Sequence, residues 1–455
     1  MNAILIKGGR VIDPVNSVDG VYDVLLSDGK VAKIAEHIEA DALWVIDAAG
    51  KVVAPGFIDM HCHLRDPGQE YKEDIRSGVR AAARGGFTGI CCMPNTNPVN
   101  DNAAVTHYIK SSARLDWYGN GVHVYPVGAV SKGLKGVEMA EIGRMWEQGI
   151  VAISDDGNPV SNSNLFRLAM QYADRFGLFI MSHSEDKSLV GDGVMNEGFM
   201  STKLGLPGIT RAAEEAMIAR DILVAEAEGK RVHICHVSTR GGAQLIREAK
   251  ARGVRVSAET APHYIAATDE WVEGYDTNCR VNPPLREEAD RQALIAALAD
   301  GTIDVIATDH APHHEDEKRV EFALAASGIS GFETAFSVCN TVLVRSGAMT
   351  LTKLIELMSA APARLLGKRK VQGGSLAVGK VADVVILDPD REIVVDASQF
   401  ESKGKNTPFD GKRYTGVVLA TIADGEICYM DDEMIADGRM IYPESEKTEE
   451  DDDNE

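Results

Sequence analysis

The segment Asp59-Met60-His61-Cys62-His63-Leu64-Arg65-Asp66-Pro67-Gly68 follows an apolar, β-branched run at residues 52–58. Such a run is typical of a buried strand. Because side chains two apart on a strand share a face, His61 and His63 present two imidazoles side by side. The Asp-Pro-Gly turn places this pair at the C-terminal end of the strand. Two such imidazoles fit half of a metal site, although an isolated HxH pair also fits a polar strand end facing solvent.

The composition describes an ordinary globular chain of 455 residues, with 44% apolar and 25% charged residues. The formal net charge of −22 argues against a nucleic-acid-binding protein, which needs a basic face. Residues 444–455 are mostly Glu and Asp, and they predict a disordered, solvated acidic tail. An interaction role for this tail is the alternative.

The sequence also predicts the location of the protein. It contains no run of 18 apolar residues that would span a membrane, and its first residues do not resemble a signal peptide. The seven cysteines include no CxxC pair, which argues against structural zinc and redox motifs. We therefore expect a cytoplasmic protein whose cysteines are reduced and buried.

The order of strand-like and helix-like segments predicts the fold. Eight apolar strands alternate with segments of helical periodicity, which favours an α/β protein built on a (β/α)8 TIM-like barrel. A doubly wound open sheet is the competitor, but no GxGxxG motif opens a helix after the first strand. The predicted strands lie near 55–61, 87–93, 122–129, 150–154, 178–183, 232–236, 254–260 and 304–309. The clearest helical segments are 71–85, 100–115, 162–176, 211–228, 239–252 and 287–299.

The two chain ends contain short strands separated by Gly and Asp turns. Residues 1–54 are too few to bury much core alone, so they need a partner. We expect that partner in the strands of residues 366–440, which would complete a small β-sandwich beside a barrel at 55–365. Residues 441–455 would then form the acidic tail.

Polar residues recur where the predicted barrel strands end, which is where barrel enzymes perform their chemistry. Four imidazoles and at least two carboxylates would be costly beside a core unless divalent cations compensated them, and the donor set suits zinc. Two metals about 3.5–4 Å apart would hold a bridging hydroxide with a pKa near ~7. In this prediction Asp156 bridges the metals, while Asp309 is a ligand and also moves the proton during hydrolysis of an amide-like bond. His233 falls on the opposite strand face and is interpreted as structural. The candidate ligands are His61, His63, Asp156, His183, His236 and Asp309.

Other polar residues near the same strand ends are suited to binding a substrate. Arg65 offers a guanidinium that can clamp a carboxylate through two hydrogen bonds. Asn95 and Asn282 offer amides, although Asn in such loops more often only caps the turn. Residues 313–318 are interpreted as a mobile lid.

Together these motifs resemble the dihydroorotases of the amidohydrolase superfamily, in particular the bacterial type with Asp-Asp-Gly on the fourth strand. The resemblance extends from Ile4 to Tyr429. HxH is shared across the superfamily, whereas the other motifs are more specific. They are HLRDPG at 63–68, with PNT at 94–96, NPPLR at 282–286 and ATDHAPH at 307–313.

The resemblance implies a barrel with a small β-sandwich, and reversible conversion of N-carbamoyl-L-aspartate to L-dihydroorotate in pyrimidine synthesis. It implies two zinc ions per subunit on the six ligands above, with Asp156 preferred to Asp155 as the bridge. It also implies a homo-oligomer, and it leaves association with aspartate transcarbamoylase open. By position, Arg65, Asn95 and His313 would hold the substrate carboxylate, and Asn282 with the backbone around Ser327 and Gly328 would hold the ring. The pair Ser327-Gly328 departs from the Phe-Gly expected in the family.

Two other functions compete with this interpretation. Cyclic amidases acting on hydantoin, dihydropyrimidine or allantoin usually place a carboxylated lysine on the fourth strand, and residues 150–160 contain no lysine. A non-catalytic scaffold would be favoured by a missing ligand, but all six candidates are present.

Overall fold

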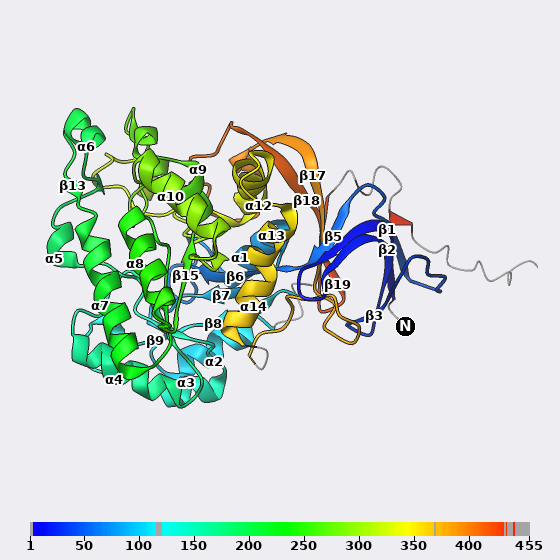
Figure 1. Ribbon diagram of the computed structural model, residues 1–455, viewed down its shortest axis with the longest axis horizontal. Helices are drawn as coiled ribbons and strands as arrows, with labels where there is room; N and C mark the ends of the chain where they lie inside the picture. Colours follow the sequence, from blue (N-terminus) through cyan, green and yellow to red (C-terminus); the bar gives the residue numbers. More distant parts are fainter. Residues whose placement is uncertain (1–2, 115–120, 368–369, 432–433, 435–439, 442–455) are drawn as a thin grey trace, which may run out of the picture.

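The computed structural model describes residues 3–114, 121–367, 370–431, 434 and 440–441. The predicted acidic tail lies outside these residues. Within them the chain is an α/β protein, with helices and parallel strands at one end of the molecule and a mixed sheet at the other (Figure 1). No helix in the described part of the chain is long and apolar enough to cross a membrane. All seven cysteines are free thiols; six are buried and Cys428 is half-buried.

The parallel strands form two sets that follow the chain order. One set pairs as β6-β7-β8 and the other as β16-β15-β14-β11-β10-β9. The first and last strands are also neighbours, because Cys62 pairs in parallel with His310 and the N–H of His63 donates to the His310 carbonyl at 2.8 Å. The strands are β6 (Phe57–Cys62), β7 (Phe87–Cys92), β8 (His123–Pro126), β9 (Gly128–Ala129), β10 (Ile153–Ser154), β11 (Ile180–Ser182), β14 (Val232–Ile234), β15 (Val256–Thr260) and β16 (Val305–Ile306).

Every helical segment predicted from the sequence contains a helix. Side chains cap the first turn of several helices. The Asp74 carboxylate accepts from the N–H of Ser77 at 2.7 Å at the start of the helix at 75–84. Asn102 and Asn162 cap the helices at 103–112 and 163–174 in the same way. The main helices are α1 (Ile75–Arg84), α2 (Ala103–Ser112), α3 (Ile142–Gln148), α4 (Ser163–Asp174), α7 (Ala212–Glu228), α8 (Arg240–Ala251) and α10 (Glu288–Ala299). Shorter ones are α5 (Lys187–Val190), α6 (Phe199–Leu204), α9 (Pro262–Ala266), α11 (Glu315–Lys318), α12 (Ala335–Cys339), α13 (Leu351–Ile355) and α14 (Ala361–Leu366).

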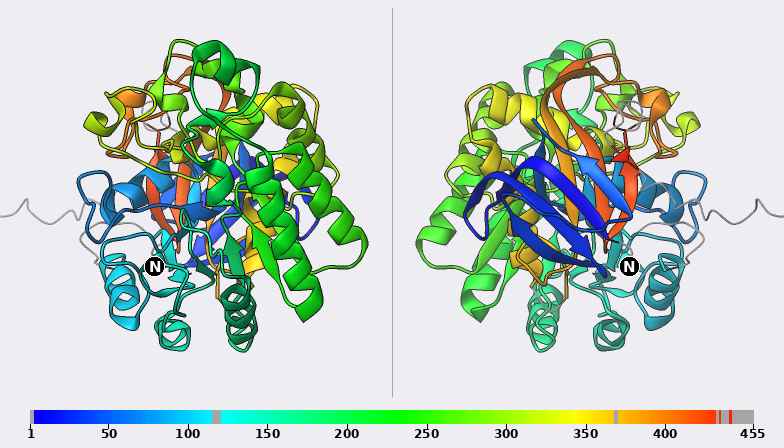
Figure 2. Two further views of the ribbon diagram at one scale, coloured as in Figure 1. Left: turned by 90° about the vertical axis from the view of Figure 1, so that its left-hand side faces the viewer. Right: turned by 90° about the vertical axis from the view of Figure 1, so that its right-hand side faces the viewer.

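Strands from both chain ends share one nine-stranded sheet. Its main path is β19-β18-β17-β5-β1-β2-β3, with β4 beside β1 and β20 beside β4. The junction is the antiparallel pair of β5 and β17, and the blue and orange strands therefore lie side by side in Figure 2. The strands are β1 (Ile4–Asp13), β2 (Val18–Ser27), β3 (Lys30–Ala35), β4 (Trp44–Asp47), β5 (Val52–Pro55), β17 (Val384–Val394), β18 (Arg413–Ala423), β19 (Glu426–Met430) and β20 (Met440–Ile441). A short parallel pair, β12 (Met195–Asn196) and β13 (Gly208–Ile209), stands apart.

The apolar run before the HxH motif is two strands rather than the single strand expected. β5 pairs with β1 and β17, whereas β6 pairs with β7. The break falls at Gly56, where an added Cβ would lie 2.2 Å from Thr88 Cγ2. Close backbone approach therefore requires glycine at this position, and periodicity alone did not show it.

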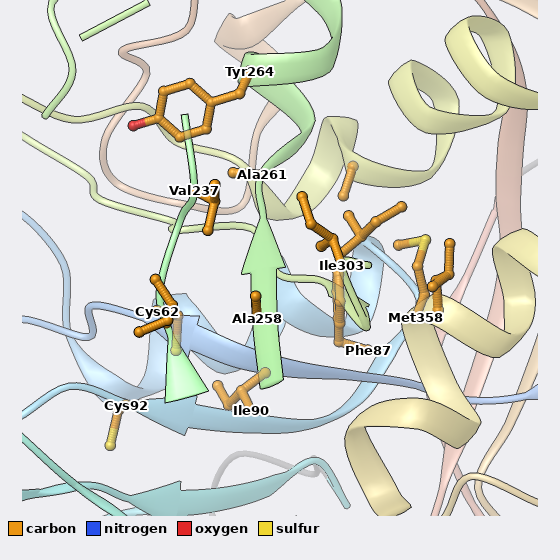
Figure 3. Close-up of a cluster of buried hydrophobic side chains, with 14 of the residues drawn as sticks. Cys62, Phe87, Ile90, Cys92, Val237, Ala258, Ala261, Tyr264, Ile303 and Met358 are labelled. Carbon is orange, nitrogen blue, oxygen red and sulfur yellow. The ribbon is translucent and has the colours of Figure 1, made fainter. Parts of the chain in front are cut away.

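The core beside the functional strands is packed by aromatic and aliphatic side chains (Figure 3). Phe57 and Phe87 are fully buried, and their rings meet edge to face at 5.8 Å between centroids. Ile90 on β7 and Ala258 on β15 are also fully buried in this cluster. This packing fixes strands whose ends carry the polar residues described next.

Candidate active site

The six predicted metal ligands gather at the C-terminal ends of the parallel strands. Each is at most 6% exposed. His61 and His63 come from the end of β6, Asp156 follows β10, His183 follows β11, His236 follows β14 and Asp309 follows β16.

Asp156 lies at the centre of the imidazole cluster. Its Oδ1 is 3.4 Å from His61 Nε2 and 3.6 Å from both His183 Nδ1 and His236 Nε2. Its Oδ2 is 3.6 Å from His63 Nε2. One carboxylate therefore faces all four imidazoles.

Asp309 supplies the second carboxylate. Its Oδ1 is 3.2 Å from His63 Nε2 and 3.6 Å from His61 Nε2. His61 and His63 thus lie between two carboxylates. Asp309 adopts φ +47° and His236 adopts φ +35°, which are left-handed conformations uncommon outside glycine. The chain therefore bends sharply at these two strand ends, where strained backbone often accompanies a functional site.

Three of the four imidazoles, those of His61, His63 and His183, have an outer hydrogen-bond partner that orients the ring. His61 Nδ1 lies 2.8 Å from Glu259 Oε1, and His63 Nδ1 lies 2.9 Å from Asn95 Oδ1. Since both oxygens accept, each Nδ1 carries the proton and each Nε2 directs a lone pair toward the carboxylates. His183 is held in the opposite orientation, with Nε2 3.2 Å from Glu185 Oε2 and Nδ1 toward Asp156.

This arrangement fits bound cations. Among the described residues, His61 Nε2 and Asp156 Oδ1 are buried side-chain atoms without a hydrogen-bond partner. In the described part of the chain, three groups have donor atoms within 4.8 Å of one another and could each hold an ion. Two consist of predicted ligands, His61 with His63 and Asp156, and Asp156 with His183 and His236. The third joins His61 to Cys235 and Glu259. Imidazole nitrogens and carboxylate oxygens are ligands that divalent transition metals prefer.

The electrostatics of the cluster lead to the same conclusion. Burial lowers the pKa of His61, but Asp156 and Asp309 outweigh burial and raise that pKa well above its ordinary value. Burial opposes ionisation of Asp156, yet the imidazoles hold its pKa well below the usual range. For His183, burial is outweighed by Asp156 and Glu185, and its pKa rises to about 9. The site therefore favours positive charge among its imidazoles, which protons or metal ions can supply.

A second layer of polar residues supports the ligands, and sequence reasoning missed its main member. Glu259 on β15 is buried and joins His61 to His233, with Oε2 3.1 Å from His233 Nε2. His233 in turn contacts Ser257 Oγ at 2.9 Å through Nδ1. Such outer contacts orient metal-binding imidazoles. A carboxylate inside an apolar strand, paired with the odd histidine on the neighbouring strand, was the signal available in the sequence.

Arg65 and His313 form a buried pair next to the predicted metal ligands. Arg65 Nη2 is 3.3 Å from His313 Nε2, and its Nε donates to the Pro312 carbonyl at 3.2 Å. His313 Nε2 also lies 3.0 Å from the Ser327 carbonyl. Burial, together with the neighbouring cations Arg65 and Lys72, lowers the pKa of His313 to about 3. A neutral imidazole beside a buried guanidinium suits an anionic ligand group.

The other residues predicted to bind substrate differ in their surroundings. Asn95 contacts the ligands themselves, because its Nδ2 donates to Asp156 Oδ2 at 3.5 Å in addition to the bond with His63. Asn282 Oδ1 is buried without a partner among the described residues. Gly328 has φ +153°, and a Cβ there would lie 2.6 Å from the Ala311 carbonyl oxygen. Only glycine fits this position.

Comparison with known proteins agrees with this site. Residues 50–242 match the family described as Dihydro-orotase-like, and residues 205–429 match the Amidohydrolase family. A protein named Dihydroorotase from Citrifermentans bemidjiense is 53% identical over 94% of this chain and 99% of its own length. One of the same name from Pelotomaculum thermopropionicum is 54% identical, with the same coverage of both chains. The chain belongs to the dihydroorotase family.

The structure is also similar to solved structures of hydantoinases. L-Hydantoinase (Dihydropyrimidinase) from Arthrobacter aurescens superposes with a TM-score of 0.84 at 28% identity, covering 94% of this chain and 96% of its own. D-Hydantoinase (Dihydropyrimidinase) from Thermus sp. gives 0.78 at 25% identity, covering 94% and 95%. The fold is therefore shared with proteins named for other cyclic substrates.

His263 is a further buried residue near the predicted metal ligands, and the sequence analysis did not identify it. It is the second residue of α9, which follows β15, and it is 1% exposed. Its Nε2 has no hydrogen-bond partner among the described residues. Burial lowers its pKa to about 4, so the ring is neutral at pH 7. The rule applied to the other strands, a polar residue just beyond the strand end, would have found it.

Proposed function

We propose that this chain is a zinc-dependent dihydroorotase, which interconverts L-dihydroorotate and N-carbamoyl-L-aspartate in pyrimidine synthesis. This reaction is inferred from the relatives that are named Dihydroorotase. The observation that carries the proposal is the position of the Arg65–His313 pair, because a buried cation beside the carboxylate–imidazole cluster suits a cyclic amide that bears a carboxylate. Hydantoin and dihydropyrimidine rings without a carboxylate have no need of that cation.

The proposed architecture is a closed (β/α)8 barrel with a small β-sandwich from both chain ends. The parallel order of β6 to β16 and the pairing of Cys62 with His310 support closure. The β5–β17 pairing supports a sandwich assembled from residues 1–54 and 366–440. The barrel would then occupy residues 55–365 and carry the site at one end.

Two zinc ions would be held by the four imidazoles, by Asp309 and by Asp156 as a shared ligand. Bound there, zinc would polarise a carbonyl and lower the pKa of a water molecule. Glu259 and Asn95 would keep the Nε2 lone pairs of His61 and His63 directed into the site through their bonds to the Nδ1 atoms.

Asp309 is proposed as the group that moves the proton. The neighbouring imidazoles outweigh burial and hold its pKa below the usual range, so the carboxylate is ionised and ready to accept. It would take a proton from the attacking water and deliver it to the ring nitrogen as the amide bond opens. In the reverse direction the same oxygen would remove a proton from the carbamoyl nitrogen.

The substrate carboxylate would lie between Arg65 and His313, with Asn95 at its side. Asn282, whose Oδ1 lacks a partner, and the backbone of Ser327 and Gly328 would hold the ring. The bonds of Asn95 to His63 and Asp156 point to a second role in positioning the ligands.

The remaining proposals concern the state of the protein in the cell. We propose a cytoplasmic homo-oligomer, and association with aspartate transcarbamoylase stays a prediction.

The decisive experiment is hydrolysis of dihydroorotate by zinc-loaded and chelator-treated protein, followed by ultraviolet absorbance. Dihydrouracil and hydantoin serve as rings without a carboxylate. We expect chelator-sensitive turnover of dihydroorotate, at most weak turnover of the two neutral rings, and activity restored by zinc. Preferential turnover of the neutral rings would instead make the protein a cyclic amidase like its structural neighbours.

A further inference from the structure

A hollow lies beside the Arg65–His313 pair, with His313 in its lining. It has a volume of about 400 Å³ and is bounded by α11, by η4 (Thr277–Cys279) and by residues 403–406. His313 lines this hollow and also contacts Arg65, with 3.3 Å between its Nε2 and Arg65 Nη2. A ligand in the hollow would lie next to the proposed carboxylate site.

The hollow is basic in a strongly acidic protein. Its lining includes the exposed cations Arg319, Lys403 and Lys405, against the single carboxylate of Glu315. Lys318 also lines the hollow, but burial lowers its pKa to about 7. The chain as a whole carries a formal charge of −22. Like charges gathered at one opening in an oppositely charged molecule create a local field that attracts counter-ions.

Among the exposed cations of the lining, Lys405 is the one whose contacts leave its charge least compensated. Its Nζ donates to the carbonyls of Ser402, at 2.8 Å, and Phe400, which are neutral acceptors. By contrast, Lys403 pairs with Asp74, and Arg319 pairs with Glu315 at 2.9 Å. Because carbonyl bonds orient an ammonium group without neutralising it, Lys405 keeps an exposed positive charge at the edge of the hollow.

Residues that line the hollow also hold His313 in place. Lys318 Nζ donates to the carbonyls of Ala326 at 2.7 Å and Thr277 at 2.9 Å. Asn406 accepts from the N–H of His313 at 2.9 Å and donates to the Gly328 carbonyl at 2.9 Å. The hollow is therefore bounded by residues that also fix His313 and the Ser327–Gly328 backbone.

We propose that this hollow is an anion-binding antechamber that collects the dicarboxylate N-carbamoyl-aspartate before it reaches Arg65. The inference rests on the proposed function and adds a binding step to it. The acyclic compound carries two carboxylates and the ring only one. The antechamber therefore favours the acyclic compound, since the electrostatic free energy of binding scales with ligand charge.

The test is charge reversal at Lys405, with the Michaelis constant measured in both directions at low salt. Lys405→Glu should raise KM about tenfold for N-carbamoyl-aspartate and about threefold for dihydroorotate, with kcat unchanged. Lys405→Gln should give smaller increases in the same order. In about 0.5 M salt the differences should shrink, because screening shortens the range of the interaction.

Lys33→Glu on β3 is the matched control, since it makes the same change of net charge on an exposed lysine of the mixed sheet. Its KM values should match those of the wild type. Equal increases for both ligands in Lys405→Glu, the same increases in Lys33→Glu, or no increase at all would overturn the antechamber. Absence of turnover by the wild-type protein would instead refute the proposed function, so the two failures are distinguishable.

Discussion

Asp155 and Asp156 are adjacent in the chain, but their carboxylates face different parts of the structure. Asp155 Oδ1 accepts from the N–H groups of Val130 at 2.8 Å and Ser131 at 3.0 Å, while Asp156 Oδ1 lies 3.4 Å from His61 Nε2. Asp155 thus anchors the loop after β9, and Asp156 faces the imidazoles. The two positions, which the sequence could rank only by resemblance, are separated by their hydrogen bonds.

Replacing each aspartate by asparagine should therefore give different results. Asp156→Asn removes the anion shared by four imidazoles, and we expect loss of most bound metal and of turnover. Asp155→Asn keeps an acceptor for the two backbone N–H groups and should retain metal. Metal content of the purified variants, measured by atomic absorption, checks this. The reverse pattern would assign Asp155 as the ligand.

The same Asp155 predicts a pH effect on stability. Burial raises its pKa to about 6, even though hydrogen bonds from Ser131 act in the opposite direction. A raised carboxyl pKa contributes stability that is present below the unfolded value of ~3.9 and is lost as the pH rises through the folded value. The unfolding free energy of the wild type relative to Asp155→Asn should therefore fall by about 2–3 kcal/mol between pH 4 and pH 7. Urea unfolding at several pH values tests this, and a constant difference would contradict it.

Glu259→Gln should weaken metal binding without removing a ligand. The Glu259 carboxylate accepts from His61 Nδ1 and also contacts His233. Without it, the His61 ring is no longer held in the orientation that directs its Nε2 into the site. Outer contacts of this kind change metal affinity about 10–100-fold. Chelator competition measures the affinity, and His233→Asn, which removes only the more distant partner, should give a smaller change. Unaltered affinity in Glu259→Gln would reduce Glu259 to a packing residue.

The sequence predicted the strand ends better than the contacts between them. Apolar runs separated by helical patterns located the strands that carry His61, Asp156 and Asp309, because buried parallel strands appear as continuous apolar runs. The split at Gly56 was missed, since it depends on the approach of Thr88 from another strand. Glu259 was missed for the same reason: its partners lie 198 and 26 residues away in the chain. Such contacts exist only after the strands are arranged.

Asp309→Asn should separate proton transfer from metal binding. Asparagine keeps the shape and one acceptor oxygen but cannot take a proton, so kcat should fall by about 10²–10⁴-fold. Part of the metal should remain, because five of the six proposed ligands are unchanged. Turnover and metal content are measured on the same preparation. Turnover near the wild-type rate would exclude Asp309 as the proton carrier.

Arg65→Met should distinguish a dihydroorotase from the cyclic amidases that share its fold. The guanidinium is buried, lies 3.3 Å from His313 Nε2 and is held by the Pro312 carbonyl, so methionine removes a charge from a fixed position. Losing a charged hydrogen bond to the substrate carboxylate should raise KM for dihydroorotate about 10–100-fold. Any weak turnover of dihydrouracil, which lacks that carboxylate, should change little, and this ring is the internal control. Steady-state kinetics on both rings checks the prediction. Equal losses on both would mean that Arg65 acts through the loop it braces, whereas a wild-type KM for dihydroorotate would leave the substrate carboxylate to other residues.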